Sequence, residues 1–393
     1  MEDFLGYRIG LFVNNSSISP SPNLYSFTVS DNIYSAFPQL DLQFPDASGL
    51  FLEFGNFGQG VPLNIKFGVA ATSAMLDVDF RSSRRDYTRP AGGTPGLNGI
   101  LEVKGLHSSF YLNRKVPDAA LKKMTVSDAV KKLFSFEAKL KVENTRGNIE
   151  SYAFDDLYFF TKDVLLPQAA SGKARPYVFF RNLHDELHFT SVDFLENSAP
   201  AENLLFGDIA GGIEEGNAYA TLNFFLPYNE GLEKTLNSFS VAGGILKNDL
   251  SFGLIEKSVA SDAKDKIPVV VGTKICNGRY FGRQFNPKVD YADLNKAFCA
   301  DAMRAGFFVD KVFAGLPFHP NLAAGKTVNA AVSLLDSEGK PELSETFSGK
   351  WLIEQSFHSW DGTTNRGMTK LILCRSSMKP RRDSIIMDRA FTG

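Results

Sequence analysis

The sequence predicts an α+β protein that is mainly β, with two tube-like antiparallel β-barrels in one chain and an α/β domain inserted between them. A short pattern occurs twice, at residues 56–64 and 321–329, and places Gly60 or Gly325 at the tip of a turn before an alternating apolar strand. Alternation of this kind is typical of half-buried strands, and a pattern repeated a domain apart predicts two diverged copies of one module.

A second pair of similar strands follows these turns. Residues 101–110 and 351–360 both alternate apolar and polar positions and carry His107 and His358. We expect both histidines to be half-buried strand residues satisfied by their neighbours rather than catalysts. The 35 phenylalanines, against 2 tryptophans, also favour sheet surfaces and large subunit contacts.

The first barrel is assigned to residues 1–116. Strands are expected at 26–31, 40–44 and 50–54, where polar and apolar residues alternate between turns rich in Gly, Pro, Asn and Asp. The polar and basic stretch 81–96 is expected to form a long exposed loop.

The hydrophobic period changes in residues 117–200, which we assign to the α/β middle domain. Thr125 stands where a helix N-cap would precede a helix with one apolar face. A second helix is expected at 151–169, and a β-hairpin at 177–192, where two apolar strands flank a polar turn.

The rest of the chain divides into the second barrel in two pieces, an insertion of unknown class and a tail, which are residues 201–250 and 301–376, 251–300, and 377–393. Renewed alternation at 218–226 predicts a strand, and 293–304 predicts a helix.

Composition excludes several classes of function. Lys plus Arg total 42 and Asp plus Glu total 44, so there is no basic excess of the kind a dedicated DNA-binding protein uses to hold phosphates. The three cysteines lie far apart, which excludes a disulfide framework and fits a reducing cytoplasm. No secretory signal and no run of membrane-spanning length is present, so no membrane partner is expected.

One motif suggests an enzyme. His184 and His188 stand four residues apart, and on a helix they would be able to share a zinc ion, so a zinc-dependent hydrolase is an alternative function. The zincin pattern requires Glu directly after the first histidine, and Asp185 stands there. In the hairpin expected here, residues four apart on one strand are separated by about 13 Å. We therefore expect two solvated histidines, no metal, no cofactor and no enzymatic activity.

Several short motifs, taken in order, resemble the baseplate hub proteins of contractile phage tails. Residues 31–49 are similar to the opening of that family, and residues 177–189 resemble part of the hub's α/β domain. Residues 349–358 and 368–375, a strand with His358 and then an alternating strand ending in Arg375, look like the end of its second barrel. Hubs of bacterial contractile injection systems share this fold.

The resemblance implies a structural virion protein of the tail baseplate, assembled in the host cytoplasm. It implies a homotrimer whose two barrels per chain form a ring of six similar units. Such a ring would cap a sixfold tail tube, seat a threefold spike, meet wedge or other baseplate proteins around it, and let DNA pass transiently through its lumen. A carbohydrate-binding β protein of a phage tail is a further alternative.

Two basic segments are candidate contacts with these partners. The lumen of a DNA-conducting tube is expected to avoid net positive charge, so the basic residues of the first segment should lie outside the bore. The tail beyond the last strand is expected to be ordered by a neighbour. The candidate residues are Arg84, Arg85 and Arg89 in the first segment, and Arg381, Arg382, Ile385, Ile386 and Met387 in the tail.

Overall fold

The structure is a computed structural model, and it describes residues 2–4, 7–18, 26–46, 58–70, 74–88, 99–110, 120–146, 148–152, 156–166, 169, 177–206, 218–220, 223–225, 279–280, 283–284, 310–335, 339, 341–344, 348–364 and 366–375. The expected strand 50–54 and the expected helix 293–304 lie outside these residues.

The first module consists of eight strands and a short 3-10 turn. They are β1 (Glu2–Phe4), β2 (Tyr7–Val13), β3 (Ser16–Ile18), β4 (Ser26–Asn32), β5 (Gln39–Asp46), β6 (Pro62–Val69), β7 (Met75–Thr88), β8 (Gly99–His107) and η1 (Ser108–Phe110). The expected alternation is present, because every second residue of β4 and most of those of β6 point into one hydrophobic core.

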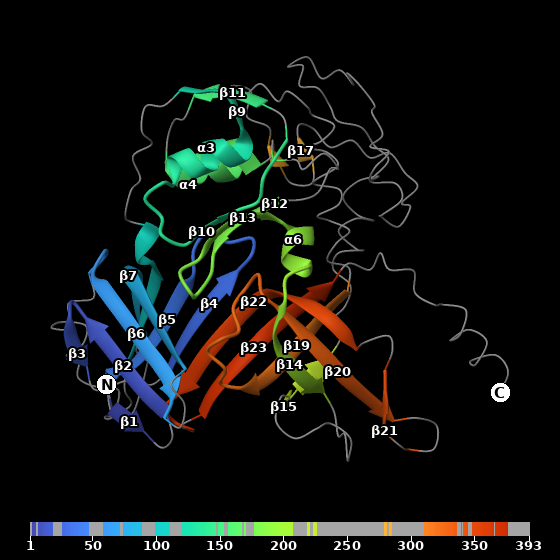
Figure 1. Cartoon of the computed structure of the whole chain (residues 1–393). Coiled ribbons are helices and arrows are strands. Elements are labelled where there is room, and N and C mark those ends of the chain that lie inside the picture. The colour runs from blue at the N-terminus through green and yellow to red at the C-terminus, as the bar shows by residue number, and fades with distance from the viewer. Residues whose placement is uncertain are drawn as a thin grey trace.

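The middle domain contains five strands and four short helical segments. They are β9 (Ala120–Thr125), α3 (Val126–Leu133), β10 (Leu140–Val142), β11 (Asn148–Tyr152), α4 (Leu157–Phe160), the π-helical η2 (Thr161–Leu165), β12 (Tyr177–Arg181), β13 (Leu187–Ser191) and α6 (Val192–Glu196). In Figure 1 this domain lies above the two β-modules.

The second module follows in sequence and is also built from strands. They are β14 (Pro200–Phe206), β15 (Ala218–Ala220), β16 (Asn223–Phe225), β19 (Asp310–Pro317), β20 (Thr327–Leu335), β21 (Pro341–Leu343), β22 (Gly349–Asp361) and β23 (Arg366–Arg375). The hairpin of β17 (Arg279–Tyr280) and β18 (Arg283–Gln284) lies between β16 and β19 in the chain.

The two modules have the same strand order. Strands β6, β7, β8, β5 and β4 lie side by side in the first module, and β20, β22, β23, β19 and β16 lie side by side in the second. Every pair within each set is antiparallel, and each set follows the same order along the chain. The expected internal repeat is therefore present in the topology.

The repeated turn is equivalent in detail. Gly60 and Gly325 both have a φ of 83°, a backbone conformation that favours glycine. The Gly60 N–H donates to the Ser82 carbonyl in β7 at 2.7 Å, and the Gly325 N–H donates to the Ile353 carbonyl in β22 at 2.9 Å. Each strand then has a β-bulge directly after that residue. The prediction of two like Gly-tipped turns is confirmed.

The second half of the predicted match is wrong. Because the turns pair with β7 and β22, β7 is the equivalent of β22, and β8 is the equivalent of β23. His107 in β8 and His358 in β22 are therefore not at equivalent positions. Strand alternation has a period of two and does not distinguish neighbouring strands, which explains the error.

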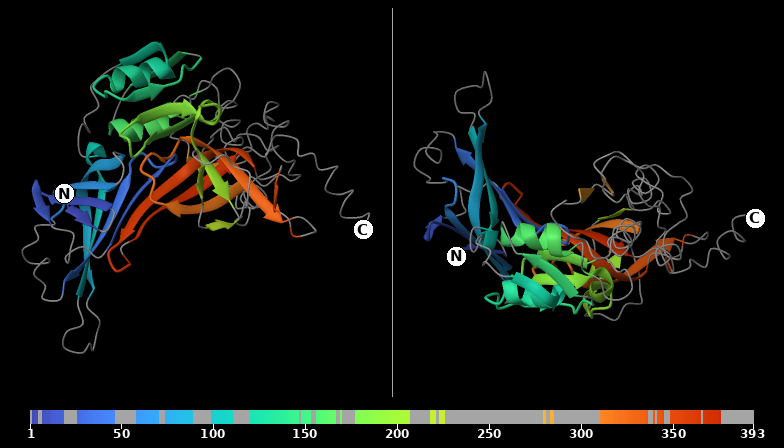
Figure 2. Two further views of the ribbon diagram at one scale, coloured as in Figure 1. Left: turned by 60° about the horizontal axis from the view of Figure 1, so that its bottom comes forward. Right: turned by 90° about the horizontal axis from the view of Figure 1, so that it is seen from above.

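A single sheet joins the modules, because β4 of the first pairs with β22 of the second. Sixteen strands belong to this sheet, and neither module closes into a barrel among the strands that the structure describes. Figures 1 and 2 show the two modules side by side along this shared sheet. The fold is mainly β with few helices, as predicted.

Two local predictions fail for the same reason. The described part of the basic stretch 81–96, expected to be a loop, forms the second half of β7, because residues up to Thr88 pair with β8, and residues 89–96 lie outside the described structure. The helix expected from residue 151 begins only at Leu157, after an Asp156 N-cap, since residues 148–152 pair with β9. In both places pairing with a distant strand overrides the local pattern. The helix after Thr125 is confirmed, and the Thr125 hydroxyl accepts the Asp128 N–H at 3.1 Å.

Candidate assembly site: the junction of the two modules and the middle domain

The seam between the modules runs along one edge of β22. Leu352 pairs with Thr327 of β20 on this edge, and farther along the strand residues 355–361 pair with residues 26–32 of β4. Strand β23 occupies the opposite edge throughout. One long strand thus carries two partners in succession on the same edge, one from each module.

Asp31 stabilises this seam through hydrogen bonds to several segments. It lies in β4, is 2% exposed, and its carboxylate accepts the Leu183 N–H at 2.8 Å and the Ala324 N–H at 3.1 Å. It also accepts the Ser356 hydroxyl of β22. One carboxylate therefore ties the first module to the middle-domain hairpin and to two parts of the second module.

Burial raises the pKa of Asp31 to about 6, and hydrogen bonds from Ser356, Leu183 and Ala324 oppose that rise without cancelling it. A buried charge of this kind is tolerated only where hydrogen bonds compensate for lost water. The ionised form of Asp31 is therefore favourable only while the Leu183, Ala324 and Ser356 donors are in place. These donors come from the middle domain and the second module, so the charge depends on how both are placed against the first module.

All five histidines of the chain lie around the same junction: His107, His184, His188, His319 and His358, here called the junction histidines. Two of them, His358 and His184, donate hydrogen bonds to backbone carbonyls of the turn that precedes β20. His358 Nε2 lies 2.8 Å from the Leu322 oxygen, and His184 Nε2 lies 3.3 Å from the Asn321 oxygen.

Burial lowers the pKa of every junction histidine, to about 3 for His358 and about 4 for His184 and His107. These three are therefore neutral at neutral pH and serve as hydrogen-bonding groups. The Nδ1 atom of His358 lies 2.9 Å from the Thr369 hydroxyl, which satisfies the second ring nitrogen.

A buried arginine holds the middle domain at this place. Arg181 is 2% exposed, its Nη2 atom lies 2.6 Å from Glu137, and its Nη1 atom bonds Asp185. The Asp185 carboxylate lies 3.6 Å from Nε2 of His107 in the first module. These ion pairs lie within the middle domain and join the hairpin turn to Glu137, and the approach of Asp185 to His107 brings the same group to the first module.

The face of the sheet that points away from the module cores carries paired charges. Arg84 lies 2.7 Å from Asp86, and Lys104 lies 3.7 Å from Asp41. Farther along, Arg366 stands opposite Asp361 in the pairing of β22 and β23. On this face, Arg84 and Lys104 each have an acid nearby, although the two bases stand directly opposite each other in the pairing of β7 and β8.

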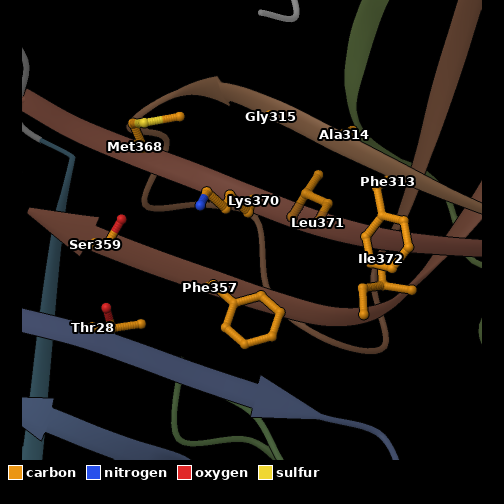
Figure 3. Close-up of a pocket in the computed structure, with 10 residues that line it drawn as sticks. All are labelled: Thr28, Phe313, Ala314, Gly315, Phe357, Ser359, Met368, Lys370, Leu371 and Ile372. Carbon is orange, nitrogen blue, oxygen red and sulfur yellow. The ribbon is translucent and has the colours of Figure 1, made fainter. Parts of the chain in front are cut away.

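A hollow of about 420 Å³ lies on the same face in the second module. Figure 3 shows that Phe313 from β19, Phe357 from β22 and Ile372 from β23 line it. The strand registers place Asp41, Asp86 and Lys104 at the equivalent positions of the first module. The two copies have thus diverged, from three charged residues in the first module to three apolar residues in the second, which lie beside Lys370.

The candidate contact residues fall partly inside the described structure. Arg84 and Arg85 are exposed on β7 and point to opposite faces, because side chains alternate along a strand. Arg89, Arg381, Arg382, Ile385, Ile386 and Met387 lie outside the described residues.

His184 and His188 stand on the two sides of the hairpin turn in different surroundings. His188 is 6% exposed and stacks on Phe180 with ring centroids 4.7 Å apart, so the expectation that it is solvated is wrong. Within the described part of the chain, no three His, Cys, Asp or Glu residues are grouped to hold a metal ion. His107 and His358 are fully buried rather than half-buried.

Sequence reasoning missed Asp31 as a site residue. The available signal was its phase, because Asp31 follows Phe27 and Val29 on the apolar face of an alternating strand. A charged residue in that phase indicates a buried and compensated carboxylate.

Two of the solved structures that match the chain are tail proteins, and the match covers nearly all of both partners. One is a tail protein from Neisseria meningitidis MC58, with 14% identity, a TM-score of 0.55, and coverage of 95% of this chain and 98% of the other. The second is the 43 kDa tail protein of prophage MuSo2 from Shewanella oneidensis, with 11% identity, a TM-score of 0.57, and coverage of 95% and 99%. No family model matches the chain, and no curated protein matches it significantly.

The chain therefore shares its fold with phage tail proteins, and the resemblance inferred from the sequence is confirmed at the level of the fold. Among the described helices, none has both the length and the apolar character needed to cross a membrane.

Proposed function

We propose that the chain is the central hub of a phage tail baseplate, a structural virion protein that joins the tail tube to the spike. The observation that carries this proposal is the doubled module, in which two sets of five strands share one order and one turn geometry. The fold shared with two phage tail proteins supports it.

A doubled module solves a problem of symmetry. Three copies of a chain with two like modules give six similar units around one axis, and closed rings of this kind are the usual form of soluble oligomers. A homotrimer is therefore able to match a sixfold tube on one side and a threefold spike on the other. Other baseplate proteins would contact its outer side.

The divergence of the two modules fits this role. Around such a ring, the charged face of the first module and the apolar hollow of the second would alternate. The scaffold would be nearly sixfold in its backbone and threefold in its side chains. A threefold partner needs such a difference, because it must distinguish alternate units.

In this proposal the face that carries these residues lines the bore through which DNA passes. Acids lie beside Arg84, Lys104 and Arg366, which weakens the attraction of phosphates to each base. Arg84 then lies on the bore side, paired with Asp86, and only Arg85 keeps the outer position expected from the sequence. Assembly in the host cytoplasm and location in the virion follow from the same role.

No observation favours the alternatives. His184 donates to a backbone carbonyl, and His188 lies 3.4 Å from Glu186 and stacks on Phe180, so a zinc hydrolase lacks a described site. A carbohydrate-binding sandwich has no need of two matched modules around an α/β domain.

The test is the oligomeric state of the full chain, alone and mixed with the spike and tube proteins of the same tail. Mass photometry is expected to give three copies, and electron microscopy class averages are expected to show a ring with six similar lobes. A chain that remains monomeric with both partners present contradicts the proposal. Stoichiometric zinc, lost on changing both His184 and His188 to alanine, would favour the hydrolase instead.

A further inference from the structure

The apolar hollow of the second module lies close to the start of the C-terminal tail. Lys370 and Ile372 of β23 line the hollow together with Phe357 of β22. Strand β23 ends at Arg375, only three residues after Ile372. The tail that follows, residues 376–393, lies outside the described structure. The hollow is therefore within easy reach of the tail of its own chain.

The charge of the hollow comes from Lys370, whose side chain is exposed. Strand pairing sets Lys370 opposite Phe357 of β22 and Gly315 of β19, neither of which is an acid. Arg84 on the same face has Asp86 beside it, whereas no described residue forms an ion pair with Lys370. An occupant of the hollow would therefore gain from carrying an acid next to apolar side chains.

The tail contains this combination in one short segment. Residues 383–388 read Asp-Ser-Ile-Ile-Met-Asp, so three large apolar side chains stand between two acids. Left in water, these three side chains would forgo the free energy of burial. The bases of the tail all lie outside the segment, at Lys379, Arg381, Arg382 and Arg389. The segment thus complements the hollow in both polarity and charge.

The connection between β23 and this segment is long enough to turn back over the hollow. Lys370 lies five residues before Arg375, which is about 17 Å along an extended strand. Asp383 lies eight residues after Arg375, and eight extended residues span up to roughly 26–29 Å. A short flexible tether holds its end at an effective concentration of about 1 mM or more. This favours the chain's own tail over the tail of a second copy.

We propose that residues 383–388 occupy the hollow of the same chain, with the apolar side chains against Phe357 and Ile372 and an acid beside Lys370. The neighbour that orders the tail is then the chain's own second module. The contact closes an apolar surface that would otherwise be open to unwanted association. It forms within one chain, so it goes beyond the proposed function and does not depend on a ring.

Cleavage by an arginine-specific protease tests the contact in the full chain, because Arg382 and Arg389 flank the segment. A docked segment is cut only when it leaves the hollow, so the cleavage rate follows the undocked fraction. The variant with Ile385→Ser, Ile386→Ser and Met387→Ser is expected to be cut at both sites at least about tenfold faster than the wild type. Equal rates in the two proteins would overturn the inference.

The charge of the hollow is tested without changing the tail. Lys370→Glu is expected to raise both cleavage rates about two- to fivefold, which is the range of an exposed ion pair. The matched control is Lys104→Glu, because Lys104 is an exposed base on the same face of the first module and lies near Asp41. This control is expected to leave both rates unchanged. No effect from Lys370→Glu, or an equal effect from Lys104→Glu, would contradict the contact.

Reversing the charges on both sides tests the pairing itself. A tail variant with Asp383→Lys and Asp388→Lys places bases beside Lys370, so it is expected to be cut faster than the wild type. Combining this tail with Lys370→Glu is expected to slow cleavage again relative to the tail variant alone. Cleavage that is as fast in the combined variant as in the tail variant would show that Lys370 does not meet these acids.

A photo-cross-linker identifies the surface and the chain that the tail contacts. The amino acid p-benzoylphenylalanine in place of Ile386 is expected to label β22 or β23 within the same chain. The product then keeps the mobility of one chain on a denaturing gel. Cross-linked dimers would place the tail on a second copy and overturn the inference, as would labelling only outside the second module. These measurements apply equally to a monomer and a trimer, so they are independent of the test of the hub proposal.

Discussion

Replacing Asp31 by alanine tests whether one carboxylate holds the junction together. The change removes the acceptor of the Leu183 and Ala324 N–H groups, which are otherwise buried. A buried donor left without a partner costs about 1–3 kcal/mol, so the two together cost about 2–6 kcal/mol. The Ser356 hydroxyl also loses the carboxylate to which it donates, because the nearby Nε2 atom of His358, 3.4 Å away, carries the proton that it donates to the Leu322 carbonyl.

Replacing Asp31 also removes a buried charge that destabilises the folded protein, so the variant regains part of the lost free energy, by an amount that depends on pH. Because burial raises the pKa of Asp31 from 3.8 to about 6, keeping it ionised at pH 7 costs the folded state roughly 3 kcal/mol. As the pH falls toward 5, the folded protein takes up a proton before the unfolded chain does, and the cost is relieved. Alanine has no such relief. At pH 7 the two effects nearly cancel, and we expect a net change between about 1 kcal/mol of stabilisation and 3 kcal/mol of destabilisation. At pH 5 the variant should be about 1 kcal/mol less stable, relative to the wild type, than at pH 7.

Urea unfolding of the full chain at both pH values measures this difference. The matched control is Asp41→Ala on the neighbouring strand, because Asp41 is exposed and its contact with Lys104 is 3.7 Å long. That change is expected to cost less than about 1 kcal/mol at either pH. The reasoning is refuted if the cost of Asp31→Ala is the same at both pH values, as for the control, or is larger at pH 7 than at pH 5.

The remaining predictions concern the repeated turn, the junction histidines and the tail. Gly325→Ala is expected to cost about 1–3 kcal/mol more than Gly60→Ala in urea unfolding. Both have a φ of 83°, but only at Gly325 would a Cβ meet the Phe180 ring, 2.4 Å from its Cζ atom; equal costs would contradict this packing. The pKa of His358, His184 and His107 is lowered to about 3–4 in the folded protein, so the unfolded chain binds more protons than the folded protein below pH 6.5. The free energy of unfolding should therefore fall by about 2 kcal/mol per pH unit between pH 6 and 4, after subtraction of the opposing effect of Asp31. A urea midpoint that does not change with pH would contradict this prediction. Truncation after residue 378 should leave a folded chain that assembles poorly with its neighbours, and normal baseplate assembly by the truncated chain would show that the tail has no such role.

Local signals in the sequence predicted the features that depend on local physics. The two Gly-tipped turns are readable because a positive φ selects glycine at one position. The helix after Thr125 is readable because its cap is formed three residues away. Each of these contacts lies within a few residues of the chain.

Features that depend on distant contacts were not readable. Asp31 finds its partners 152, 293 and 325 residues away in the sequence, and no local pattern specifies them. The second half of β7 is polar enough to resemble a loop, and only its pairing with β8 makes it a strand. The equivalence of β7 with β22 likewise required the register of both strands.

The central claim is that two like modules in each chain alternate around one closed ring. An electron cryomicroscopy map of the chain assembled with its spike and tube tests it most directly. The account predicts three chains around a threefold axis, with six modules in the ring. A map with a single copy of the chain at the centre, or with only one module of each chain in the ring, would contradict it.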